Sequence, residues 1–107
     1  MDFQSLIQRK RERFQQLESE IADPRLFDNR KRAGEIMREH SAIKHLLGKW
    51  EELEVVRRQL TDNRELAASD DADLAQMAQE EIPALEQRAA DLEFDVQVAL
   101  LPPDESD

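Results

Sequence analysis

The sequence predicts an all-α protein, an antiparallel three-helix hairpin bundle with coiled-coil-like packing. Ala, Leu, Glu, Gln and Arg dominate, whereas only 2 Gly, no Tyr and 5 % aromatic residues are present. Strands and tight hairpin turns need the residue types that are scarce. Apolar residues recur at spacings of three and four, and two short breaks divide this pattern into three long stretches. Isolated helices are marginal in water, so the three stretches must pack against each other.

The first helix is predicted from about residue 3 to residue 22. Its apolar residues share one helical face; they are Phe3, Leu6, Ile7, Phe14, Leu17 and Ile21. Asp23-Pro24 ends the helix, because proline lacks an amide and restricts the residue before it. We expect Leu26 and Phe27 to tuck against the end of the hairpin, with Asp28 as the N-cap of the next helix.

The second helix is predicted over residues 29–68. Its apolar stripe consists of Ala33, Ile36, His40, Ile43, Leu47, Trp50, Leu53, Val56 and Leu60. These spacings fit a period of 3.6 better than a strict period of 3.5, which is typical of a straight bundle helix. Trp50 is therefore interpreted as a core residue.

The third helix is predicted over residues 72–101, after an acidic turn that suits a helix N-terminus. Its pattern contains two heptad rows; one is Ile82, Ala89 and Val96, and the other is Ala78, Leu85, Leu92 and Ala99. Pro83 removes one backbone hydrogen bond, so the sequence predicts a single helix with a kink there. Pro102-Pro103 ends the helix, and residues 104–107 read as a solvated tail.

Composition excludes several classes of protein. Without cysteine there is no disulfide, thiol nucleophile or Cys-type zinc site. The N-terminus lacks the pattern of a signal peptide, and the longest apolar run, residues 98–101, is far too short to span a bilayer. The length of 107 residues suits a single helical domain over residues 1–107. We expect a cytoplasmic protein that does not contact a membrane.

The net charge of −10 is distributed unevenly. Residues 1–64 contain 14 Lys or Arg and 12 Asp or Glu, a net charge of +2. Residues 65–107 contain one basic residue, Arg88, and 13 acidic residues, a net charge of −12. The two parts of the chain therefore suit different partners.

No catalytic, metal or cofactor site is expected. His40 and His45 lie five residues apart, which places them about 140° apart around a helix, and His40 reads as a hydrogen-bonded interior residue. Asp70, Asp71 and Asp73 lack the glycine and the spacing of a calcium loop, and capping a helix explains them. No serine stands in a Gly-x-Ser-x-Gly elbow and no phosphate-binding glycine loop occurs.

Two basic clusters are candidates for contact with RNA phosphates. One is Arg9-Lys10-Arg11 with Arg13, and the other combines Arg25 with Arg30, Lys31 and Arg32. The alternative is that these cations pair with neighbouring Glu or with the acidic third helix. Our candidate contact residues are Arg25, Arg30, Lys31 and Arg32.

Three features together resemble one family. Residues 68–81 resemble a family segment of paired acids and apolar residues that ends in Met-Ala-Gln-Asp/Glu-Glu, and Asp23-Pro24 matches the turn of the family's first hairpin. Val98-Ala99-Leu100-Leu101-Pro102-Pro103-Asp104 resembles the family's Leu-Leu-Leu-Pro-x-Asp exit. The chain is thus similar to the N-terminal domain of bacterial class I peptide chain release factors, most of all to the release factor 1 type. Pro83 departs from the helix-forming residues expected there.

This resemblance implies translation termination at the stop codons UAA and UAG. It implies that the chain is the N-terminal fragment of a longer protein and no enzyme itself, since the family's Gly-Gly-Gln loop and stop-codon tripeptide belong to later domains and neither occurs here. The implied partners are rRNA and protein at the stalk base of the large ribosomal subunit, and other domains of the same factor. The chain itself is expected to be monomeric.

Two other hypotheses stay open. The regular heptads of the third helix suggest a self-associating coiled-coil adaptor. A tRNA-binding helical arm like that of seryl-tRNA synthetases would also be a long hairpin. Such an arm should be basic toward its tip, whereas the third helix here is strongly acidic.

Overall fold

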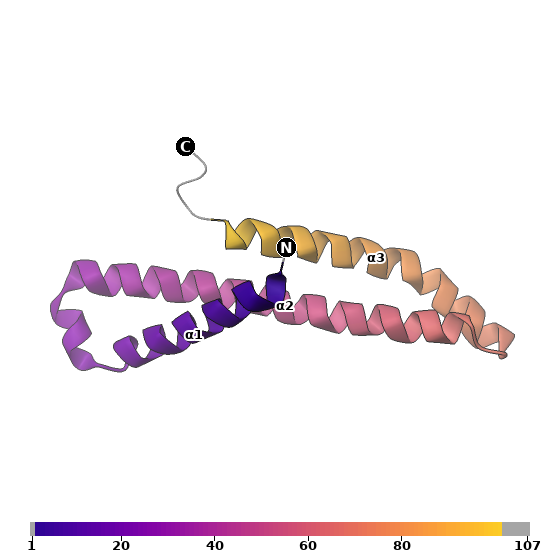
Figure 1. Cartoon of the computed structure of the whole chain (residues 1–107), viewed down its shortest axis with the longest axis horizontal. Coiled ribbons are helices and arrows are strands. Elements are labelled where there is room, and N and C mark those ends of the chain that lie inside the picture. Colours follow the sequence, from indigo (N-terminus) through magenta and orange to yellow (C-terminus); the bar gives the residue numbers. More distant parts are fainter. Residues whose placement is uncertain (1, 102–107) are drawn as a thin grey trace. The chain divides into compact units, whose positions relative to one another are not determined.

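The computed structural model describes residues 2–101, which form three α-helices and one 3-10 turn, with no strand among them (Figure 1). The elements are α1 (Phe3–Ile21), η1 (Pro24–Asp28), α2 (Arg30–Ala67) and α3 (Ala72–Leu100). The helices begin and end within one residue of the predicted positions, and the all-helical class is confirmed. The predicted tail and the proline pair before it lie outside the described residues.

The chain divides into two compact units. The described part of the first unit ends at Gly48 and contains α1, η1 and the first half of α2. The second unit, residues 49–101, contains the rest of α2 and α3. Each unit is an antiparallel pair of helical segments, and α2 contributes to both.

In the first unit, α1 pairs with the beginning of α2. The core consists of the buried residues Leu17, Ile36 and Ile43, and the partly buried residues Phe14, Ile21, Leu26 and Leu47 pack against it. The predicted apolar face of α1 is thereby confirmed, because Ile7 and Leu17 are buried and Phe3, Leu6, Phe14 and Ile21 are half-buried. Of the predicted apolar pair in the linker, only Leu26 packs inward, and Phe27 is 55 % exposed.

The prediction that Asp28 caps α2 is wrong. Asp28 is the last residue of η1, and Asn29 takes the cap position instead. The Asn29 side chain accepts a hydrogen bond from the Arg32 amide at 3.1 Å, and its carbonyl accepts one from the Ala33 amide at 2.9 Å. The connection between α1 and α2 uses one more residue than expected because it forms a complete 3-10 turn. Asp23 caps this turn by accepting a hydrogen bond from the Arg25 amide at 3.0 Å.

In the second unit, the later part of α2 pairs with α3. Leu53, Leu92 and Val96 are fully buried there. The other buried residues of this unit are Trp50, Val56, Leu60 and Ala78. In the predicted rows of α3, Ile82, Leu85 and Ala89 are half-buried, but Ala99 is exposed. The predicted core position of Trp50 is confirmed, and the Arg57 guanidinium lies 5.6 Å from the centre of its ring.

The buried residues of α2 also revise the predicted stripe. Leu46 is buried, whereas the predicted Leu47 is only partly so. Most of the buried positions follow two rows with a repeat of seven; one is Ile36, Ile43 and Trp50, and the other is Leu46, Leu53 and Leu60. Ala33 and Val56 are also buried but belong to neither row, so the heptad repeat accounts for six of the eight buried positions of α2.

α3 is a single helix that contains Pro83. Figure 1 shows the axis of α3 changing direction between its first turns and the remainder, as expected for a proline-containing helix. The Asp71 side chain caps this helix by accepting hydrogen bonds from the backbone amides of Asp73 and Leu74. The Gln79 side chain donates to the Ala67 carbonyl at 3.3 Å and so connects the start of α3 with the end of α2.

Ion pairs join the two segments of the second unit. Arg88 lies 2.6 Å from Glu52, Arg57 lies 2.7 Å from Glu93, and both Arg64–Glu86 and Lys49–Asp95 measure 3.4 Å.

Among residues 2–101, none of the helices has the length and the apolar character that a membrane span requires.

Replacing Leu53 by Ala should lower the free energy of unfolding by about 2–5 kcal/mol, because the side chain is 0 % exposed and its removal leaves a cavity. Urea denaturation followed by circular dichroism measures this change. Leu66→Ala is the matched control, since Leu66 lies on the same helix and is 44 % exposed. Equal effects of the two substitutions would contradict the packing of α2.

Candidate functional site

The four predicted contact residues lie together where η1 leads into α2. Arg25 belongs to η1, and Arg30, Lys31 and Arg32 are the first three residues of α2. All four are exposed to solvent. We refer to these four residues as the basic hairpin end.

Two of the four cations are already paired with carboxylates. The Arg25 guanidinium contacts the Asp23 carboxylate at 3.0 and 3.2 Å, and Arg32 contacts Glu20 at 3.0 Å. The hydrogen bonds from the side chain and the amide of Arg25 hold the pKa of Asp23 below its ordinary value. The predicted pairing with a neighbouring Glu is thus observed for Arg32, whereas Arg25 pairs with an Asp instead.

Arg30 and Lys31 form no ion pair with any residue among 2–101. They stand at the N-terminus of α2, where the helix dipole carries partial positive charge. The first turn of α2 contains no acidic residue. Positive charge from two free side chains and from the helix end is therefore concentrated in one place, and this suits an anionic partner.

A shallow hollow lies beside the basic hairpin end and is lined by Glu20, Asp23, Arg25 and Leu26. Its carboxylates are those that hold Arg25 and Arg32. The hollow is open to solvent, so these charges remain hydrated, and it does not enclose a ligand. Two of its lining residues, Glu20 and Asp23, are the acids that partly neutralise Arg32 and Arg25.

The other predicted basic cluster is on α1. Arg13 forms a two-pronged ion pair with Glu39 on α2, with its Nε and Nη2 atoms at 2.7 and 2.8 Å from the carboxylate oxygens. This contact holds the pKa of Glu39 below its ordinary value and raises that of Arg13. Arg9 and Arg11 are exposed and form no ion pair within the described residues.

His40 forms the predicted hydrogen bond but is half-buried rather than interior. Its ring stacks on Phe14 with centroids 4.5 Å apart, and its Nε2 atom lies 3.3 Å from a carboxylate oxygen of Glu18. Only 18 % of the side chain is exposed. No group of three or more potential metal ligands occurs among residues 2–101.

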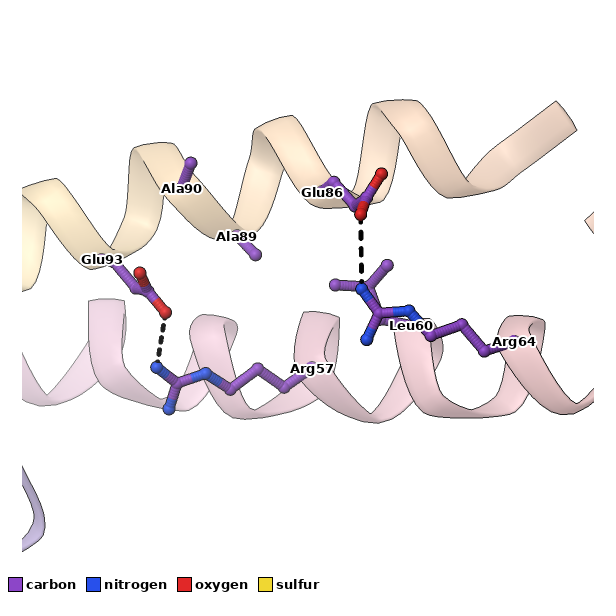
Figure 2. A pocket seen from close by; sticks show the side chains of 7 residues that line it. All are labelled: Arg57, Leu60, Arg64, Glu86, Ala89, Ala90 and Glu93. Carbon is purple, nitrogen blue, oxygen red and sulfur yellow. Dashed lines mark hydrogen bonds and ion pairs between the residues drawn. The ribbon is translucent and has the colours of Figure 1, made fainter. Parts of the chain in front are cut away.

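The second unit contains a groove along α2 and α3, shown in Figure 2. Two arginines of α2 reach across it, Arg57 to Glu93 and Arg64 to Glu86. Leu60 and the Ala89 side chain face the space between these ion pairs, and Ala90 borders the groove although its side chain points away from α2. The groove presents paired charges and small apolar side chains.

Sequence reasoning did not identify Glu20 and Asp23 as the acids that neutralise part of the site. Asp23 stands two residues before Arg25, a local spacing that could have revealed the contact. Glu20 and Arg32 are twelve residues apart and meet only through the antiparallel pairing of α1 and α2. No local signal in the sequence indicates that pair.

Comparison with known proteins identifies the family. The family model described as "PCRF domain" matches residues 10–107. The chain belongs to the PCRF domain family. This match confirms, at the level of the family, the resemblance that residues 68–81 and 98–104 suggested.

Proteins named peptide chain release factor 1 are similar to this PCRF domain. The one from Akkermansia muciniphila is 47% identical over 104 residues, which is 97% of this chain and 29% of that protein. Those from Geotalea uraniireducens and Geobacter sulfurreducens are 37% and 36% identical over 89% of the chain and 26% of each relative. The chain thus spans less than a third of the length of these relatives. No solved structure matches it.

The contact of Arg13 with Glu39 makes stability depend on pH. Because the pKa of Glu39 is lower in the folded state, its stabilising effect is complete above the ordinary value of 4.5 and is lost as the pH falls through the lower, folded pKa. Glu39→Gln should therefore lower the free energy of unfolding at pH 7 by about 0.2–1 kcal/mol, the range for partly exposed ion pairs. Below pH ~4 this difference should shrink.

Denaturant titrations at pH 7 and pH 3 provide the measurement. Glu35→Gln is the matched control, because Glu35 is an exposed acid of the same helix with no ion pair among the described residues. A pH-independent effect of Glu39→Gln, or an equal effect of the two substitutions at pH 7, would contradict this assignment.

Proposed function

We propose that this chain is a ribosome-docking domain of a cytoplasmic peptide chain release factor that terminates translation at UAA and UAG. The observation that carries the proposal is its 47% identity to a peptide chain release factor 1 over 97% of the chain. The sequence contains no Gly-Gly-Gln segment, so in this proposal the chemistry of release belongs to other domains of the same polypeptide.

The basic hairpin end is the proposed point of contact with the large subunit, at rRNA and protein of the stalk base. Its support is electrostatic, because exposed cations at a helix N-terminus attract phosphate groups. Within this surface we assign the main contacts to Arg30 and Lys31. Arg25 and Arg32 would first have to leave Asp23 and Glu20, and although exposed ion pairs are weak, breaking them subtracts from the gain of each new phosphate contact.

The double substitution Arg30→Gln and Lys31→Gln should weaken binding of the chain to 70S ribosomes by about tenfold and reduce the dependence of log K on log salt by about 1–2 units. Both effects are expected because two phosphate contacts are lost. Fluorescence anisotropy of the labelled chain, titrated with ribosomes at several salt concentrations, measures them.

The matched control is the double substitution Lys44→Gln and Arg58→Gln. It removes the same pair of residue types from exposed positions that form no ion pair within residues 2–101. Equal losses for the two double variants would show that only net charge matters and would contradict a local contact. Absence of ribosome binding by the parent chain would contradict docking itself.

A further prediction concerns which part of the proposed factor has release activity. The 107-residue chain should not hydrolyse peptidyl-tRNA, whereas the full polypeptide encoded by its gene should release nascent peptide from ribosomes stalled at UAA or UAG. Release of labelled peptide measures both. Full release activity in residues 1–107, or none in the full polypeptide, would contradict the assignment.

The two other hypotheses are outcomes of simple measurements. Light scattering that finds a dimer at tens of micromolar, a range of moderate affinity, would favour a self-associating adaptor. A salt-sensitive gel shift with free tRNA, at affinities that match those for the ribosome, would favour a tRNA-binding arm.

A further inference from the structure

The last turns of α3 carry large apolar side chains on two opposite faces. Leu92 and Val96 are 0 % exposed, and they are the α3 side of the second unit's core. Phe94, Val98 and Leu101 are 65 %, 50 % and 57 % exposed. A helix that is apolar on opposite faces is typical of one that is covered on both.

Phe94, Val98 and Leu101 form one line, which we call the outer stripe. Their spacings of four and three place them on the same face, about 180° around the helix from the buried side. Ala90 stands one turn before Phe94, and Figure 2 shows it pointing away from α2 while Ala89 points toward it. The outer stripe therefore faces away from the helix that α3 packs against in its own unit.

The outer stripe is free of charge in a chain of which 37 % is charged. This face contains one charged residue from residue 87 onward, Asp91; its other positions are Gln87, Ala90, Phe94, Gln97, Val98 and Leu101. Gln87 donates to Asp91 at 2.9 Å, at the edge of the face. Three large exposed apolar side chains in line, with a single charge beside them, mark a surface that contacts protein rather than water alone.

The surroundings of the outer stripe select its partner. Residues 49–101 contain five Lys or Arg and fourteen Asp or Glu, a net charge of −9. Asp91 borders the stripe and forms no ion pair with the described residues. A nucleic acid or a second copy of this acidic segment would be repelled, whereas an apolar protein surface with a basic rim is complementary.

We propose that the outer stripe docks on another part of the same polypeptide, on an apolar patch bordered by Lys or Arg. In the relatives most of the polypeptide lies outside the matched stretch, since 104 aligned residues make up 29% of one of them. Three side chains bury too little area for a stable complex of free partners, but a covalent connection supplies the effective concentration that closes the contact. This proposal rests on the chain being part of a longer polypeptide and does not depend on ribosome docking.

Hydroxyl-radical footprinting with mass spectrometry tests the proposal on two proteins, the 107-residue chain and the full polypeptide encoded by its gene. The oxidation rate of Phe94 should be at least threefold lower in the full polypeptide. Met77 is the internal control, because it is 61 % exposed on the same helix away from the stripe, and its rate should be the same in both proteins.

A pair of variants distinguishes docking from a general slowing of oxidation. In the full polypeptide, Phe94→Ser should raise the oxidation of Val98 and Leu101 to the rates seen in the 107-residue chain, whereas Met77→Ser should leave them low. Circular dichroism should show both variants folded, since both side chains are exposed.

Several results would overturn the proposal. These are equal Phe94 rates in the two proteins, a gene that ends after codon 107, and protection of Phe94 that appears only when ribosomes are added. Protection already present in the 107-residue chain, together with a dimer by light scattering, would instead assign the outer stripe to a second copy.

Discussion

α2 is the element on which both units depend. It is a single helix of 38 residues, and its buried rows supply the partner face for α1 in the first unit and for α3 in the second. Neither α1 nor α3 could remain helical in water without such a partner. α2 continues through Gly48. An added Cβ at this position would meet no atom within 4 Å, so packing does not require a glycine here. Burial of neighbours such as Leu46 and Trp50 holds the helix together at this point.

Antiparallel pairing along α2 also decides which charges meet. In the first unit, the pairing brings Arg13 to Glu39 and Glu20 to Arg32; in the second it brings Arg57 to Glu93 and Arg64 to Glu86. Each pair is partly exposed and contributes little to stability by itself. These pairs neutralise some cations and leave others, such as Arg30 and Lys31, without an ion pair among residues 2–101.

The helices could be predicted from the sequence because their causes are local. Apolar spacing, the Asp23-Pro24 break and the acidic turn before α3 all act over a few residues. Except for the cap of α2 at Asn29, which a local 3-10 turn decides, the details that failed depend on contacts between helices. Whether Leu46 or Leu47 enters the core is decided by which side of α2 its partners cover, and the pairing of Arg32 with Glu20 follows from the alignment of α1 and α2. For the candidate site, the sequence could name the four cations, and the spacing of Asp23 and Arg25 is a local signal for one pair, but no local signal indicates that Arg32 is paired.

The two longest helices begin in opposite electrostatic ways. α3 starts with a favourable arrangement of charge. The Asp71 carboxylate accepts hydrogen bonds from two backbone amides, and Asp73 adds a negative charge in the first turn. α2 starts with three consecutive cations beside the positive end of its dipole, an arrangement that disfavours the helix by about 0.3–1 kcal/mol per charge when exposed. Asn29 offsets part of this cost by capping, but it neutralises no charge. A local cost that the fold does not need is typical of a functional surface, and it supports assigning the contact with an anionic partner to the beginning of α2.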